Sequence, residues 1–372
     1  MLRAPMIAVY LTVFGLSFLV ASGWAQRSGT TFAPAIPKTW DDGAIASLEV
    51  PLANPIGSPK HVSADYYYRI PVAPIYKTYP IYAPGHEPPG YIDRLKEQEP
   101  VIVWDDVGHA PPLKTEADWI KAGELVFDAP INFGGIVTIA DTRDPAWYKE
   151  LGTPVAADGT IPFLSYVVRK KGTVEVGQTS CAVCHSRVMP DGSVAKGAQA
   201  NYAIVRSVAL ARRARARVSD TAQLLAGTRL GFKASWAMPW LSPDPFAPID
   251  QMSFEELSAA LESFPTGVVA RQRTSLLYPV QVPDLIGIKD RRYLDHTGLS
   301  RQRSIGDLMR YAAMNRGRFD GGDALANHNG FIPADPPSFK KLPDPATQSR
   351  YSDEQLYALA LYIYSLSAAA EP

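Results

Sequence analysis

Five consecutive residues, Cys181-Ala-Val-Cys184-His185, bring together two thiols and an imidazole. Two thiols at this spacing can add to the two vinyl groups on one edge of a haem. The residue after the second cysteine then places its imidazole under the iron as the proximal ligand. The pattern therefore predicts one covalent haem c, attached through Cys181 and Cys184 and bound at the iron by His185.

Other uses of a cysteine pair fit this sequence less well. A structural zinc site takes four ligands, commonly from a second Cys or His pair, and the chain has no other cysteine. A thioredoxin-type pair is expected beside a βαβ unit, which the sequence around residue 181 does not indicate. Two cysteines in 372 residues also exclude a disulfide framework.

The N-terminal segment has the parts of a secretory signal peptide. Arg3 precedes an apolar run over residues 6–20, and residues 21–25 end in small residues at the −3 and −1 positions. We expect cleavage after Ala25 and a periplasmic or otherwise exported protein with no membrane span in the mature chain. A retained anchor is the alternative, but the run is shorter than the ~20 residues of a spanning helix.

The composition indicates a globular protein with an unusual N-terminal region. Lys and Arg number 37, as do Asp and Glu, so net charge gives no argument for a nucleic-acid partner and none is expected.

Prolines and tyrosines crowd residues 26–112, which we predict to be an extended arm anchored by its tyrosines. A proline-rich recognition segment is the alternative. Residues 113–372 are predicted to form one domain.

Capping signals predict the helices of this domain. They occur at Thr115 with Asp118, Ser253 with Glu256 and Ser352 with Gln355. A further helix is predicted over residues 304–315, short strands and turns over 129–178, and a hairpin at residues 190–192. Five arginines over residues 206–217 predict a solvated helix face, with a docking patch for an acidic partner as the alternative.

The helices that flank the haem motif resemble those of class I c-type cytochromes. The segment with Gly123 and Phe127 is similar to the family's N-terminal helix, and Leu359-x-x-Tyr362-Ile363-x-x-Leu366 is similar to its C-terminal helix. The resemblance implies that the two helices cross with Gly123 against Tyr362. It also implies a mainly α fold, a cytochrome c core of three or more helices around the haem, expanded here by long loops, small β-hairpins and the N-terminal arm.

A second resemblance covers residues 279–316, which are similar to the C-terminal lobe of bacterial di-haem cytochrome c peroxidases. Those enzymes carry two haem motifs and this chain has one, so the resemblance does not imply peroxidase activity.

A low-spin electron carrier needs a sixth iron ligand, usually Met or His. Met309 is the first candidate and Met314 the second, because the resembling lobes take their axial methionine from a comparable segment. The two are about 140° apart around a helix, so only one can face the iron. Met238, His296, His328 and an open position remain alternatives. Arg187, close to the motif, is a candidate partner for a haem propionate, with an ordinary surface arginine as the alternative.

Together these features predict an exported mono-haem cytochrome that carries single electrons between periplasmic redox proteins. The alternative is a haem enzyme with an open or displaceable sixth position, acting on peroxide or oxygen. The single haem and the available methionines favour electron transfer, whereas the large insertions and the resemblance to the peroxidase lobe favour the enzyme. An exported binding scaffold with an incidental cysteine pair is a third hypothesis.

Overall fold

The structure is a computed structural model of the chain. It describes residues 32–43, 60–61, 63–134, 137–236, 247–269, 280–294, 300–320, 331–332 and 344–367. The fold is a mixed one, 42% helical, with small antiparallel sheets and hairpins. The helices and hairpins agree with the prediction, but the sheet content exceeds that of a mainly α fold. The segment predicted to be a signal peptide lies outside the described residues.

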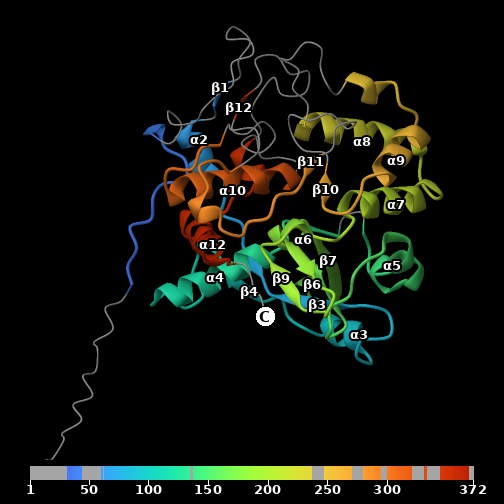
Figure 1. The fold of residues 1–372 in the computed structure, drawn as a ribbon, viewed down its shortest axis with the longest axis horizontal. Helices are drawn as coiled ribbons and strands as arrows, with labels where there is room; N and C mark the ends of the chain where they lie inside the picture. Colours follow the sequence, from blue (N-terminus) through green and yellow to red (C-terminus); the bar gives the residue numbers. More distant parts are fainter. Residues whose placement is uncertain are drawn as a thin grey trace, which may run out of the picture.

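Three helices build the core beside the haem motif. They are α4 (Glu116–Asp128), α10 (Ile305–Asp320) and α12 (Asp353–Ser365). In Figure 1, α12 lies between the other two, and both pack against it. The predicted capping boxes at Thr115 and Ser352 are confirmed at the starts of α4 and α12, so the sequence located both helices correctly.

A four-stranded antiparallel sheet occupies the other side of the motif. Its order is β3-β6-β7-β5, and its strands are β3 (Thr78–Tyr82), β6 (Thr160–Lys170), β7 (Thr173–Gln178) and β5 (Asn132–Phe133). The sheet buries a separate apolar cluster that includes Phe163 and Tyr202, whose rings stack 5.1 Å apart. The segment predicted to hold short strands and turns therefore supplies three strands of this sheet, and the longest of them, β6, has 11 residues.

The N-terminal region contributes regular structure as well as extended chain. Besides β3 it contains α2 (Ala64–Arg69), α3 (Tyr91–Lys96), β1 (Lys60–His61) and the paired strands β2 (Ile75–Tyr76) and β4 (Ile102–Trp104). Tyr66 and Tyr67 are buried in the helical core. The tyrosine-rich segment therefore supplies part of the core itself.

A group of three helices lies beyond the sheet: α7 (Ile204–Ala216), α8 (Thr221–Trp236) and α9 (Phe254–Glu262). The predicted capping box at Ser253 is confirmed. Within the arginine-rich segment, Arg213 pairs with Glu255 and Glu262 of α9. One of the five arginines therefore links two helices and is not available to an external partner.

The remaining elements are short. They are α5 (Pro145–Leu151), α6 (Cys181–His185), β8 (Ser186–Val188), β9 (Val194–Lys196), β10 (Val268–Val269), β11 (Val280–Gln281), β12 (Phe331–Ile332) and four 3-10 turns at Asp141–Arg143, Ala247–Asp250, Ile288–Asp290 and Pro345–Thr347. Strands β8 and β9 form the hairpin predicted around residues 190–192. Among the described residues, no helix combines the length and the apolarity needed to cross a membrane.

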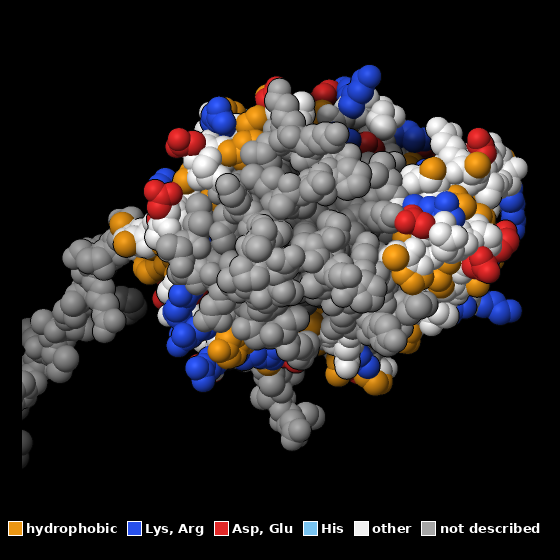
Figure 2. All heavy atoms as spheres, turned by 90° about the horizontal axis from the view of Figure 1, so that it is seen from above, with side chains coloured by type: hydrophobic (Ala, Val, Ile, Leu, Met, Phe, Trp, Pro, Cys, Tyr) orange, Lys and Arg blue, Asp and Glu red, His pale blue; other side chains and the backbone are white. Residues whose placement is uncertain are grey.

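Figure 2 views the molecule from above, and undescribed atoms cover most of that face. Charged side chains of both signs are scattered around its edge. This face therefore gives no separate argument for a charged partner.

Candidate functional site

The residues of the haem motif form a single helical turn between the sheet and the helical core. Strand β7 ends at Gln178, and α6 begins only three residues later at Cys181. The chain changes direction at Thr179, which has φ +59°. This left-handed conformation is uncommon for a β-branched residue and stores strain. The sheet therefore leads into the motif through a tight, conformationally demanding connection.

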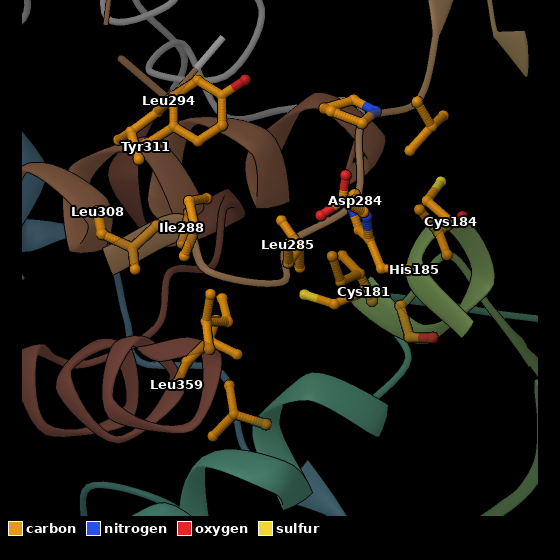
Figure 3. A pocket seen from close by; sticks show the side chains of 18 of the residues that line it. Cys181, Cys184, His185, Asp284, Leu285, Ile288, Leu294, Leu308, Tyr311 and Leu359 are labelled. Atoms are coloured by element: carbon orange, nitrogen blue, oxygen red, sulfur yellow. The ribbon is translucent and has the colours of Figure 1, made fainter. Parts of the chain in front are cut away.

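Cys181, Cys184 and His185 all line one pocket (Figure 3). Most of its wall is aliphatic and comes from α4, α10, α12 and the loop 282–288; examples are Val126, Leu308, Leu359, Ile363, Leu285 and Ile288. The space inside this wall, with the open solvent at its mouth included, is about 1140 Å³. The pocket is therefore open on one side and lined mainly by apolar side chains, which suits a mostly apolar ligand.

The backbone of the motif is fixed by hydrogen bonds from the segment that follows β9. The Gly197 N–H donates to the His185 carbonyl at 2.7 Å, and the Ala200 N–H donates to the Cys184 carbonyl at 3.0 Å. The Gly197 carbonyl in turn accepts from the Leu285 N–H at 2.7 Å. Gly197 thus connects the motif to the pocket wall, and these bonds fix the direction in which the His185 side chain leaves the backbone.

Gly197 suits this position for two reasons. Its φ is +87°, a region that favours glycine. A Cβ at this residue would also lie 2.8 Å from Cδ1 of Leu366, at the end of α12. A larger residue would therefore push the hairpin away from the helical core.

The loop that closes the pocket is stabilised by one arginine. Nη2 of Arg291 lies 2.7 Å from Oδ1 of Asp284 and 2.8 Å from the Ile286 carbonyl oxygen, and its Nη1 donates to the Asp284 carbonyl at 2.9 Å. Oδ1 of Asp284 also accepts from the Ile286 N–H at 3.0 Å. Asp284 lines the pocket, and the Arg291 guanidinium compensates the negative charge of its carboxylate.

The Cys181 side chain is in an environment that disfavours the thiolate. Burial raises the pKa of its thiol to about 12, with smaller contributions from Cys184 and Asp128. Reactive redox cysteines and metal-bound thiolates instead require a lowered pKa. Cys181 is therefore a protonated thiol at neutral pH.

A charged cluster lies next to Cys181. Nζ of Lys196, at the end of β9, is 2.8 Å from Oε1 of Glu124 and 2.6 Å from Oδ2 of Asp128, both on α4. Burial raises the pKa of Asp128, and the nearby Lys196 ammonium opposes that rise. The lysine therefore joins the β8–β9 hairpin to the helical core close to the motif.

The structure brings together only some of the residues predicted for the site. Cys181, Cys184 and His185 share the pocket, whereas Arg187 is exposed, does not line it and donates to the Gln199 carbonyl at 3.5 Å. Met309 and Met314 are buried in the helical core and do not line the pocket. The other candidate ligands, Met238, His296 and His328, lie outside the described residues.

Helix α10 faces the pocket with Leu308, Tyr311 and Ala312. At about 100° per residue, these three cover an arc of about 100°, and Met309 and Met314 lie about 60° beyond its two edges. Sequence analysis did not select Tyr311 because it considered only Met and His as side chains that could supply the sixth iron ligand. The i, i+3, i+4 spacing of the three residues was the available signal.

Two further findings bear on the identity of the site. In the part of the chain that the structure describes, no group of three or more His, Cys, Asp or Glu side chains is arranged to hold a metal ion, so the zinc alternative gains no support there. Comparisons of the chain with known family models, with curated proteins and with solved structures found no match. The functional argument therefore depends on the site itself.

Proposed function

We propose that the chain is a mono-haem c-type cytochrome with its haem in the pocket lined by Cys181, Cys184 and His185. The observation that carries the proposal is the convergence of all three side chains on one largely aliphatic pocket. The donor set fits the group: two thiols for the vinyl groups and one imidazole for the iron, all within one helical turn.

Each part of the site has a defined task in this proposal. Cys181 and Cys184 would hold the cofactor covalently, and His185 would bind its iron. The aliphatic side chains of α4, α10 and α12 exclude water, which influences the reduction potential. When bound, the haem supplies one-electron redox chemistry. The hydrogen bond from the Gly197 N–H to the His185 carbonyl would hold the backbone from which the imidazole reaches the iron.

The packing of α4 on α12 supports membership of the class I c-type cytochromes. Gly123 contacts Tyr362 and the Ala358 backbone, and the rings of Phe127 and Tyr362 lie 5.2 Å apart. This is the contact that the resemblance implied. The β5–β7 segment between α4 and α6 departs from a compact member of that family, so we propose an expanded form.

We further propose that the protein is exported to the periplasm and carries single electrons between redox proteins. An electron carrier needs a rigid, water-poor haem pocket and a closed sixth position. The aliphatic pocket wall, built on the buried helices of the core, supports the first requirement.

One observation favours the second candidate, a haem enzyme with an open sixth position acting on peroxide or oxygen. Met309 and Met314 do not line the pocket, so neither supplies a thioether to a haem placed there. If no other residue binds the iron, small molecules have access to it.

Absorption spectra of the matured protein with and without carbon monoxide separate the two functions. An electron carrier gives a six-coordinate reduced spectrum that carbon monoxide leaves unchanged over minutes. A rapid carbon monoxide complex in the wild-type protein contradicts electron transfer as the primary function and supports the open-site enzyme.

A further inference from the structure

We propose that α7 is the docking surface for an acidic protein that exchanges electrons with the haem, and that Arg212 and Arg215 contact the acidic side chains of this partner. The inference rests on the proposed function and goes beyond it, because it assigns the side of the molecule on which a redox partner binds and the chemistry of that partner.

Helix α7 carries positive charge that the surrounding structure does not balance. The helix contains no Asp or Glu. Arg213 is paired with Glu255 and Glu262 of α9. In the part of the chain that the structure describes, no acidic side chain pairs with the other four arginines, which are Arg206, Arg212, Arg215 and Arg217. These four charges are therefore available to an external partner.

Arg212 and Arg215 form a pair of like charges on one side of α7. They are three residues apart, which places them about 60° from each other around the helix, whereas Arg213 lies about 100° from Arg212. Arg212 is partly buried and Arg215 is exposed. Burial lowers the pKa of the Arg212 guanidinium, and the neighbouring Arg215 lowers it further. Like charges at this spacing destabilise a helix, and an anionic group placed between them would relieve the repulsion.

The position of α7 brings a bound partner close to the haem motif. The helix begins four residues after Ala200, whose N–H donates to the Cys184 carbonyl. It also packs against β10, whose Val269 lines the pocket. Figure 1 shows α7 on the same side of the helical core as α6 and β10. Arg212 lies about 12 Å along α7 from its start, so a partner bound there approaches the haem from the side of Cys184.

The chemistry of the surface favours an acidic protein over a lipid membrane. A guanidinium forms two parallel hydrogen bonds with a carboxylate, which gives both affinity and orientation. A helix that lies in a membrane interface instead needs a free apolar face. In α7, Ile204 and Leu210 pack on the sheet cluster and Val205 packs on the α9 cluster, so these apolar side chains are already used.

The test is the Arg212→Gln, Arg215→Gln double variant of the full-length holoprotein. The matched control is Arg69→Gln with Lys170→Gln, which removes the same charge from two exposed residues on α2 and β6. Stopped-flow spectroscopy follows the transfer of one electron from the ferrous haem to hexacyanoferrate(III), an anionic oxidant, over a range of ionic strengths and with poly-L-glutamate as competitor.

We expect the wild-type rate to fall as salt is added and to be inhibited by poly-L-glutamate, because both weaken the attraction between the arginines and the anion. The double variant should react several-fold more slowly at low salt, with a weaker salt dependence and little inhibition. The control should resemble the wild type.

Three outcomes would overturn the proposal. If the double variant and the control have equal rates and equal inhibition, α7 is not the docking surface, and the proposed cytochrome stands. If phosphatidylglycerol vesicles bind the wild type but not the double variant, while poly-L-glutamate has no effect, the surface binds lipid. If haem staining shows no covalent haem in the wild type, the proposed function fails, and the role of α7 in electron exchange fails with it.

Discussion

Gly123 of α4 lies directly against Tyr362 of α12. A Cβ on Gly123 would come within 2.7 Å of the Cβ of Tyr362 and within 2.0 Å of the Ala358 carbonyl oxygen. The two helices can approach this closely only because the residue at the crossing has no side chain. The contact between Gly123 and Tyr362 was predicted from the sequence, and the structure confirms it.

Gly123→Ala should therefore destabilise the protein despite the better helix propensity of alanine. The added methyl group meets the backbone of α12, which cannot move aside as a flexible side chain would, and overpacking of this kind costs roughly 1–3 kcal/mol. Urea unfolding measures the loss. Gly227→Ala in α8 is the control, because a Cβ there meets nothing within 4 Å, and it should be neutral or stabilising. Equal effects of both substitutions would disprove the close crossing.

Lys196→Met should weaken the connection between the β8–β9 hairpin and α4. It leaves the Glu124 and Asp128 carboxylates without their shared cation, at a cost of about 1–2 kcal/mol at neutral pH. The surface pair Lys171–Glu99, at 2.5 Å, supplies the control: Lys171→Met should cost less than about 1 kcal/mol.

The pH dependence of the Lys196→Met variant follows from Asp128. The pKa of the Asp128 carboxyl is raised in the folded protein. Its favourable contribution to the free energy of unfolding is therefore fully present only below the pKa that the carboxyl has in the unfolded chain, which is near 4. That contribution is lost as the pH rises through the folded pKa. Removing Lys196 raises this pKa further, so the cost of the substitution should shrink when unfolding is measured at pH 4 instead of pH 7. A destabilisation by Lys196→Met that grows on acidification would contradict the raised pKa of Asp128.

The Cys181 thiol should react slowly before haem is attached. With a pKa of about 12, its thiolate fraction at pH 8 is on the order of a thousandfold below that of an unperturbed thiol with pKa near 8.5. Iodoacetamide labelling of folded Cys184→Ala apoprotein, followed by mass spectrometry, measures the rate, with the urea-unfolded protein as reference. Labelling at the unfolded rate under native conditions would show that the thiol is not buried as described.

Met309→Ala should affect stability without affecting the haem spectrum. Met309 is fully buried in the helical core, and truncation of such a side chain costs about 2–5 kcal/mol. Met309→Leu keeps most of the volume and should be milder. Because Met309 does not line the pocket, the absorption spectra of both folded variants should match that of the wild type. A switch to a high-spin spectrum would restore Met309 as the sixth ligand.

The sequence was sufficient to predict features that depend on local chemistry. The capping boxes at Thr115, Ser253 and Ser352 located three helices because each cap is satisfied within four residues. The placement of Cys181, Cys184 and His185 in one pocket follows from their spacing on one turn. The glycine at the helix crossing was found only through the resemblance to c-type cytochromes.

Long-range features were not predictable in the same way. Strand β3 pairs with β6, about 80 residues later, and no local pattern specifies a partner at that distance. The rotation of α10 was equally hidden, because Met309, Tyr311 and Met314 are all compatible with a buried face. Packing against α12 decides which of them faces the pocket, and that information lies outside the helix.

The central claim is the covalent haem, and denaturing gel electrophoresis with haem staining tests it most directly. The protein is produced in a bacterial host with c-type haem maturation machinery, beside the Cys181→Ala, Cys184→Ala double variant. We predict a haem-stained band at the mass of the mature chain for the wild type and none for the double variant. A wild-type band that is visible by immunoblot but carries no haem stain would contradict the account.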